Sequence, residues 1–152
     1  MKKIALAIIA ITLFTCCGCK QEQKMVEKAA YEYSYAMANY DVDGAAKYAT
    51  EETKNTTLKT AKVLIQKVDS SYIKSDTPAK IYIVDTKIVN DTCAVATYHK
   101  ITPLKDFSDT LELRKRNGEW YAHVPPRTVN TPQDTSDSKK SQNTKGFQKI
   151  KD

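Results

Sequence analysis

Three cysteines lie close together near the start of the chain, where their thiols are candidates for covalent or metal chemistry. Cys16, Cys17 and Cys19 follow an apolar run over residues 4–14 that a short basic segment precedes. These features are typical of a secretory signal, and the run is too short to span a bilayer. No histidine lies nearby, so a metal site is the less favoured interpretation. We therefore expect residues 1–18 to be a signal peptide that is removed.

The residues around these cysteines resemble a lipobox, the site at which bacterial lipoproteins are cleaved and acylated on a cysteine. That family has a small residue before the modified cysteine, and Gly18 before Cys19 fits this pattern best. Leu13 fits another part of the pattern for Cys16, which stays open as the alternative, whereas Cys17 fits least well. Each buried methylene of an acyl chain contributes about 0.8 kcal/mol, so several chains anchor a domain firmly.

Lys20 directly follows the favoured lipidation site and bears on the destination of the protein. Inner-membrane retention signals of enteric bacteria resemble an Asp at that position. The resemblance therefore implies a protein of the cell envelope that is anchored in the outer membrane, with residues 19–23 as a lipid-anchored linker.

The groups that could do acid–base or nucleophilic chemistry are scattered along the rest of the chain: Tyr33, Asp41, Asp43, Tyr98, His99, Tyr121 and His123. Both aspartates lie in a turn between helices, where carboxylates cap helix ends. The sequence places no carboxylate to orient either histidine, so we interpret both as surface or rim residues. Cys93 lies in an alternating apolar stretch and is expected to pack as a small hydrophobe. With no coherent catalytic set and no metal or cofactor motif, we expect a protein that is not an enzyme and holds no cofactor.

The first part of the domain has the periodicity of helices. A helix is predicted over residues 22–40, and its apolar stripe is Val26, Ala30, Tyr33, Met37 and Tyr40. Asp43 is expected to cap a second helix over residues 44–49. A third helix is expected to begin at Asn55 or Thr56 and to end at residues 69–71. Its predicted apolar stripe is Leu58, Ala61, Leu64, Ile65 and Val68.

From residue 80 the period changes to two, which indicates strands. They are predicted over residues 80–89, 92–102, 109–116 and 119–124, with a loop at 103–108. Asn90-Asp91 and Asn117-Gly118 predict tight turns. The second strand alternates Ala94, Ala96 and Tyr98 with Cys93, Val95 and Thr97, and the last two strands place Glu112, Arg114, Tyr121 and His123 opposite their apolar faces. Helices followed by an antiparallel meander predict an α+β fold with the helices on one face of a curled sheet.

Charge and composition exclude some partners. The 24 Lys and Arg residues exceed the 18 Asp and Glu residues, but they are scattered and belong to no nucleic-acid-binding module. We therefore expect no nucleic-acid partner. Residues 128–152 are almost free of apolar side chains and are predicted to be a disordered basic tail.

Three segments together resemble the small lipoproteins of the nuclear transport factor two-like superfamily, in particular the lumazine-binding-like group of Bacteroides relatives. They are residues 38–48, 88–96 and 111–121, the last of which ends in a Gly-x-Trp strand. The resemblance covers about residues 24–125, and the domain is placed at 24–127. It implies a cone-shaped, cystatin-like fold with a pocket between helices and sheet. The lining residues that it suggests are Tyr33, Met37, Tyr98 and Trp120.

The resemblance implies a fold and leaves the activity open, because the superfamily contains enzymes, ligand binders and assembly domains. We expect a non-catalytic envelope lipoprotein whose domain binds a small apolar molecule or a partner protein. One alternative is an acid–base lyase or isomerase that uses the pocket. The other is a structural module that forms a homodimer through the sheet face.

Overall fold

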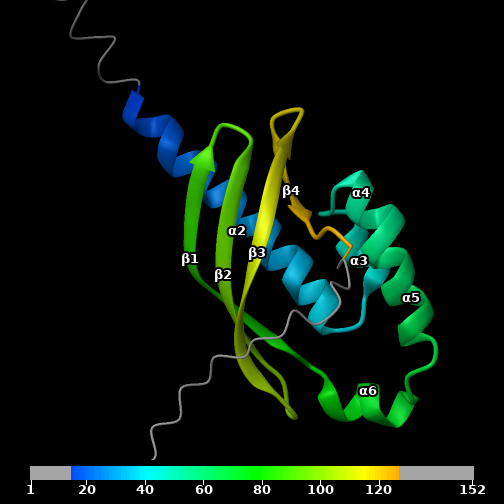
Figure 1. Ribbon diagram of the computed structural model, residues 1–152. Helices are drawn as coiled ribbons and strands as arrows, with labels where there is room; N and C mark the ends of the chain where they lie inside the picture. Colours follow the sequence, from blue (N-terminus) through cyan, green and yellow to red (C-terminus); the bar gives the residue numbers. More distant parts are fainter. Residues whose placement is uncertain (1–14, 127–152) are drawn as a thin grey trace, which may run out of the picture.

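The computed structural model describes the backbone of residues 15–126 and the side chains of residues 20–126 (Figure 1). The expected signal peptide and basic tail therefore fall largely or wholly outside the described residues. The helices are α2 (Thr15–Ala38), α3 (Val42–Ala46), α4 (Glu51–Thr53), the π-helical turn η1 (Lys54–Leu58), α5 (Lys59–Ile65) and α6 (Ser70–Asp76). The strands are β1 (Lys80–Asn90), β2 (Cys93–Ile101), β3 (Asp106–Arg116) and β4 (Glu119–His123). Within residues 15–126, no helix has both the length and the apolar content that a membrane crossing needs.

The four strands form one antiparallel sheet in the order β1-β2-β3-β4, and α2 runs diagonally across one of its faces (Figure 1). Helices α3 to α5 lie beside the β4 edge, and α6 lies at the far end from the start of α2. The predicted α+β class, with helices on one face of a curled antiparallel sheet, is therefore confirmed.

The core between α2 and the sheet is built largely from small side chains. From the helices it takes Val26, Ala29, Ala30, Tyr33, Ala36, Val42, Ala45 and Leu58, from the segment between α3 and α4 Ala49, and from the sheet Ala94, Ala96, Leu111, Leu113, Trp120 and Ala122. Val26, Ala30 and Tyr33 of the predicted stripe thus lie in the core and Met37 packs against it, whereas Tyr40 lies beyond the helix end. The predicted alternation of the second strand is confirmed, because Ala94 and Ala96 share the buried face. Because so many of these side chains are alanine, the helix lies close to the strands and fills the space beneath the sheet.

The turn after α2 differs from the prediction in its cap and its boundary. The helix ends at Ala38 and Tyr40 takes a left-handed conformation, with φ of 64°. Asp41, and not Asp43, caps α3, because its Oδ1 accepts the Gly44 N–H at 2.8 Å. A Cβ on Gly44 would lie 2.1 Å from the Asp41 carboxylate, so the cap requires glycine there. Asp43 instead pairs with Lys62 at 2.7 Å.

The third predicted helix begins earlier and is followed by another helix. It starts at α4, where Thr50 is the cap residue and accepts the Thr53 N–H, and continues through η1 into α5. The segment at 69–71 starts α6 instead of ending a helix, because Asp69 accepts the Ser71 N–H at 2.7 Å. Both errors have one cause: Thr and Asp are read as turn residues, although they cap helices equally well. Leu64 is 57% exposed, so the predicted stripe is only partly buried.

Both predicted turns of the sheet are confirmed. Asn117 and Gly118 have φ of 52° and 83°, as a two-residue hairpin requires. The predicted loop at 103–108 is shorter than expected, because β3 already begins at Asp106. Cys93, which is expected to pack as a small hydrophobe, lies only half-buried on the sheet face away from α2, 4.0 Å from a Glu112 oxygen. Strand alternation puts it opposite the buried Ala94.

A buried carboxylate joins three parts of the chain at the α6 end. Asp76 is 1% exposed and accepts hydrogen bonds from the hydroxyls of Tyr40 and Thr102, both at 2.6 Å. Burial, the largest single influence, by itself would raise the pKa of Asp76, whereas these two hydrogen bonds lower it. With the added field of Lys105 and Lys100, they hold the pKa of the carboxyl below its usual value.

Replacing this carboxylate should destabilise the domain. We expect Asp76→Ala to lower the free energy of unfolding by about 3 kcal/mol at pH 7, because the buried Thr102 hydroxyl and the half-buried Tyr40 hydroxyl lose a charged acceptor. Urea unfolding measures this loss. Asp85→Ala, which removes an exposed carboxylate of β1, is the matched control and should change stability little.

The lowered pKa of Asp76 predicts how the free energy of unfolding changes with pH. The ionised carboxylate stabilises the fold above its unfolded-state pKa of 3.8, and this contribution disappears as the pH falls through the lower folded-state value. The unfolding free energy of the wild-type protein should therefore fall more steeply below about pH 4 than that of Asp76→Ala. Equal slopes for the two proteins would contradict the assignment.

Candidate functional site

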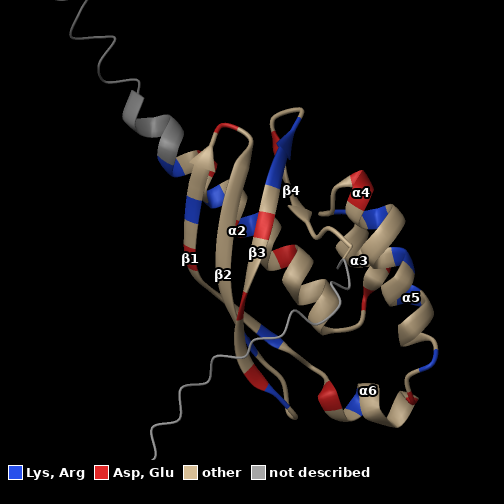
Figure 2. Cartoon of the chain, in the orientation of Figure 1, with Lys and Arg blue, Asp and Glu red and all other residues tan. Residues whose placement is uncertain are grey.

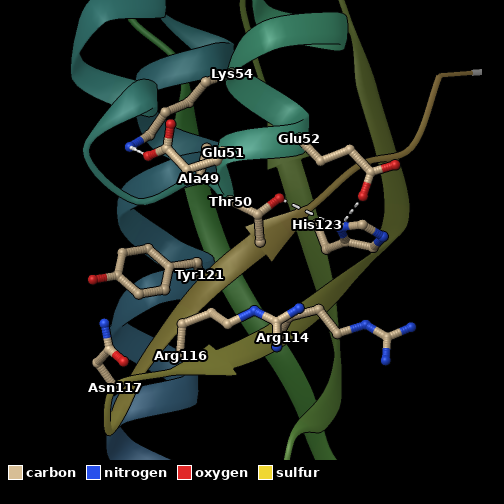
Figure 3. A pocket seen from close by; sticks show the side chains of 10 residues that line it. All are labelled: Ala49, Thr50, Glu51, Glu52, Lys54, Arg114, Arg116, Asn117, Tyr121 and His123. Atoms are coloured by element: carbon tan, nitrogen blue, oxygen red, sulfur yellow. Dashed lines mark hydrogen bonds and ion pairs between the residues drawn. The ribbon is translucent and has the colours of Figure 1, made fainter.

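A hollow, which we call the arginine hollow, lies between the outer face of β3 and β4 and the helix α4. It encloses about 600 Å³ and is open to solvent (Figure 3). Its lining residues are Ala49, Thr50, Glu51, Glu52, Lys54, Arg114, Arg116, Asn117, Tyr121 and His123. The lining is mostly polar, which distinguishes this hollow from the alanine-rich interior beneath the sheet.

Strand alternation supplies the sheet side of the arginine hollow. Arg114 and Arg116 are two residues apart on β3 and therefore project from the same face. Tyr121 lies opposite Arg114 in the register of β3 and β4, on that same face. Lys115, between the two arginines, faces the other way, where it pairs with Glu22 of α2. The hollow thus receives both guanidinium groups and the core side receives the lysine.

The helix side of the hollow is held to β4 by backbone and threonine contacts. Ala49 forms a bridge with Ala122, and the Thr50 N–H donates to the Ala122 carbonyl at 2.9 Å. The fully buried Thr53 hydroxyl accepts the Val124 N–H at 2.8 Å and lies 3.4 Å from the Ala122 carbonyl. These bonds cover part of the β4 edge and fix α4 beside the strand.

The charges around the hollow are unevenly paired. Lys54 pairs with Glu51 at 2.6 Å, and Arg114 pairs with Glu112 at 2.5 Å. Arg116 has no carboxylate within 4.0 Å among the described residues, and it is exposed. Figure 2 shows the basic end of β3 facing the acidic start of α4 across this region. Arg116 is therefore the cation of the hollow that is available to an anion.

His123 contributes a ring to the same hollow, but its contacts are not those of a catalytic relay. Its Nδ1 lies 3.3 Å from the Thr50 hydroxyl and 3.9 Å from Glu52 Oε2, and both side chains approach it from the helix side (Figure 3). A relay needs the hydroxyl and the carboxylate on opposite ring nitrogens. The Thr50 oxygen also accepts the Thr53 N–H, so it serves as a helix cap.

His99 does have partners on both ring nitrogens. Its Nδ1 lies 3.0 Å from the Ser108 hydroxyl and its Nε2 lies 2.9 Å from Asp106 Oδ1. The three groups come from β2 and β3 and lie on the outer sheet face, outside the arginine hollow. Their side chains are substantially exposed, with Asp106 66% accessible. The carboxylate that orients this ring could not be assigned from the sequence, because it becomes a neighbour only through strand pairing.

The residues suggested as pocket lining lie mainly in the core. Tyr33 is 6% exposed, and burial, followed by the field of Tyr98, raises its pKa to about 12. Burial also raises the pKa of Tyr98, which with Met37 packs against the core. Trp120 is 4% exposed and borders a second, smaller hollow. The pocket role of these four residues stays a prediction.

The arginine hollow itself was not predicted, although part of its signal was visible. The alternation of the last two strands already placed Arg114, Tyr121 and His123 on the face away from the core. Arg116 continues that alternation by one step. The contribution of Thr50 and Lys54 could not be inferred, because it depends on how α4 packs beside β4.

No protein-family model matches this chain, and no curated protein matches its sequence. One similar solved structure is that of a Campylobacter jejuni protein named as a candidate NTF2-like transpeptidase. The two share 14% sequence identity with a TM-score of 0.50, over 64% of this chain and 96% of that chain. At this identity the likeness shows the fold alone, which is a nuclear transport factor two-like fold.

Proposed function

We propose that this chain is a small lipoprotein of the Bacteroides type, anchored by lipid in the cell envelope, whose non-catalytic domain binds a small anionic ligand. The observation that carries the binding role is the arginine hollow, where Arg114 and Arg116 project from one strand face and Arg116 lacks a carboxylate partner among the described residues. Guanidinium groups bind carboxylate and phosphate oxygens through paired N–H donors. The polar lining favours such a ligand over the apolar molecule that the sequence suggests.

The proposed anchor is compatible with the way α2 meets the sheet. Glu22 pairs with Lys115, and the Gln23 amide donates to Thr86 at 3.2 Å. Both residues follow Cys19, so cleavage before that cysteine keeps these contacts and leaves the helix attached to its lipid. The basic residue after Cys19 supports the outer membrane as the destination.

Loss of the lipidated cysteine should release the protein from the membrane. We expect Cys19→Ser to abolish incorporation of an alkyne-labelled fatty acid and to move the chain into the soluble envelope fraction, because the acyl chains supply the membrane affinity. Cys16→Ser should keep both the label and the outer-membrane fractionation. The reverse pattern would assign the lipid to Cys16. If both single variants and the double variant Cys16→Ser/Cys19→Ser still carry the label, both assignments are contradicted.

Anion binding should depend on the unpaired arginine. We expect inorganic phosphate to bind the full chain, and Arg116→Gln to weaken this binding by about tenfold, because a charge-assisted hydrogen bond contributes about 1.5–3 kcal/mol. Calorimetric titration of the protein in lipid vesicles measures it. Lys67→Gln removes an equal, exposed charge far from β3 in sequence and should leave the affinity unchanged. If both variants bind phosphate equally weakly, the loss is due to the change in net charge and the proposed role of Arg116 is contradicted.

A second candidate function is acyl transfer. It is favoured by the hydrogen-bonded side chains of Ser108, His99 and Asp106. A hydroxyl, a histidine and a carboxylate in hydrogen-bond contact are the groups that nucleophilic catalysis uses. The similar Campylobacter jejuni protein also carries the name of a transpeptidase. Binding remains the leading proposal, because these three groups lie on an open face and line neither the arginine hollow nor the smaller hollow beside Trp120.

The two candidates give opposite results with a fluorophosphonate probe, which reacts with activated serines. Under the binding proposal, the wild-type chain should be labelled no more than its heat-denatured form. Labelling of the folded chain that disappears in Ser108→Ala and falls in His99→Gln would establish the second candidate. Ser75→Ala, which changes a serine of α6, is the matched control.

A further inference from the structure

A second hollow, which we call the tryptophan hollow, lies where α2, the end of α3 and the start of β4 meet. It encloses about 220 Å³, less than the roughly 300–1,000 Å³ that is usual for drug-sized ligands. Met25 and Ala29 of α2, Tyr48 and Trp120 supply apolar surface, while Lys28 and Lys47 supply charge. Tyr121 borders this hollow and the arginine hollow, but the other lining residues are distinct.

Trp120 has an unused hydrogen-bond donor in this region. Its side chain is 4% exposed, and its indole Nε1 has no acceptor among the described residues. A buried donor without an acceptor costs about 1–3 kcal/mol, so such groups are uncommon in folded domains. Lys115 lies over the same ring, with its Nζ 5.7 Å from the ring centroid, and does not supply an acceptor. The indole N–H therefore stays without an acceptor in the described domain, and it is shielded from solvent.

The two lysines of the tryptophan hollow are also unpaired. Neither Lys28 nor Lys47 has a carboxylate within 4.0 Å among the described residues, and both are exposed. The one carboxylate of the lining, Glu119, already accepts the Tyr121 hydroxyl at 2.6 Å. The hollow thus combines apolar walls with two unpaired cationic side chains.

From this combination we propose that the tryptophan hollow is a second ligand site, which binds a small amphipathic carboxylate. The apolar part of the ligand packs on Met25, Ala29 and Tyr48, and removes their surface from water. The carboxylate oxygens accept hydrogen bonds from the ammonium groups of Lys28 and Lys47, since one carboxylate has about four acceptor positions. The site is independent of the anion site proposed above, because it uses neither Arg114 nor Arg116.

Trp120 is the single tryptophan of the chain, so its fluorescence reports on this hollow alone. We use octanoate as the probe, on the full chain in lipid vesicles. Octylammonium has the same alkyl chain with the opposite charge and controls for partition into the bilayer. We expect octanoate to change the Trp120 emission saturably, and octylammonium to produce no saturable change.

Variants of Lys28 and Lys47 test whether these lysines cause the change in Trp120 emission. The double variant Lys28→Gln/Lys47→Gln should weaken octanoate binding by about tenfold or more, because two charge-assisted contacts are lost. Arg116→Gln and Lys67→Gln should keep the wild-type affinity, and far-UV circular dichroism verifies that each variant is folded. An unchanged affinity in the double variant, or the same response to octylammonium, would overturn the proposal. A response to octanoate without phosphate binding would retain this site and reject the arginine site.

Discussion

The close packing of one long helix on a curved sheet is the constraint on which the rest of this domain depends. Alanines on both surfaces, such as Ala30 of α2 and Ala94 and Ala96 of β2, are fully buried and bring the helix near the strands. In a cone-shaped fold the space between these layers is the expected pocket. Here small side chains and Tyr33 fill it, so the hollows lie at the margin of the sheet instead of beneath it.

That margin is the β4 edge, where two kinds of bond act together. Backbone bonds from the segment at 48–50 cover the middle of the strand, and the Thr53 hydroxyl fixes α4 beside its end. The arginine hollow lies on the outer side of this junction and the tryptophan hollow lies towards α2. Because both are made by the same junction, a change in the position of α4 relative to β4 would alter the arginine hollow most directly.

Charge is distributed in a way that follows from strand alternation. Lys115 faces α2 and is neutralised by Glu22, whereas Arg116 faces outward and has no carboxylate partner among the described residues. Neighbouring residues of one strand thus have different surroundings, an ion pair with α2 for Lys115 and solvent for Arg116. At the opposite end of the domain, Asp76 accepts hydrogen bonds from two hydroxyls and ties α6 to the turn after α2 and to the β2–β3 loop.

By itself, the sequence determined the fold class, the hairpin at Asn117-Gly118 and the inner faces of the strands, because periodicity and turn chemistry are local properties. The alternation along the last two strands also placed Arg114 and His123 on the face opposite the apolar side chains. Only the tertiary structure decided which threonine or aspartate caps a helix, since the same residue types serve turns and caps. It alone decided where the hollows lie, because a cavity depends on how segments far apart in sequence, such as α4 and β4, pack against each other.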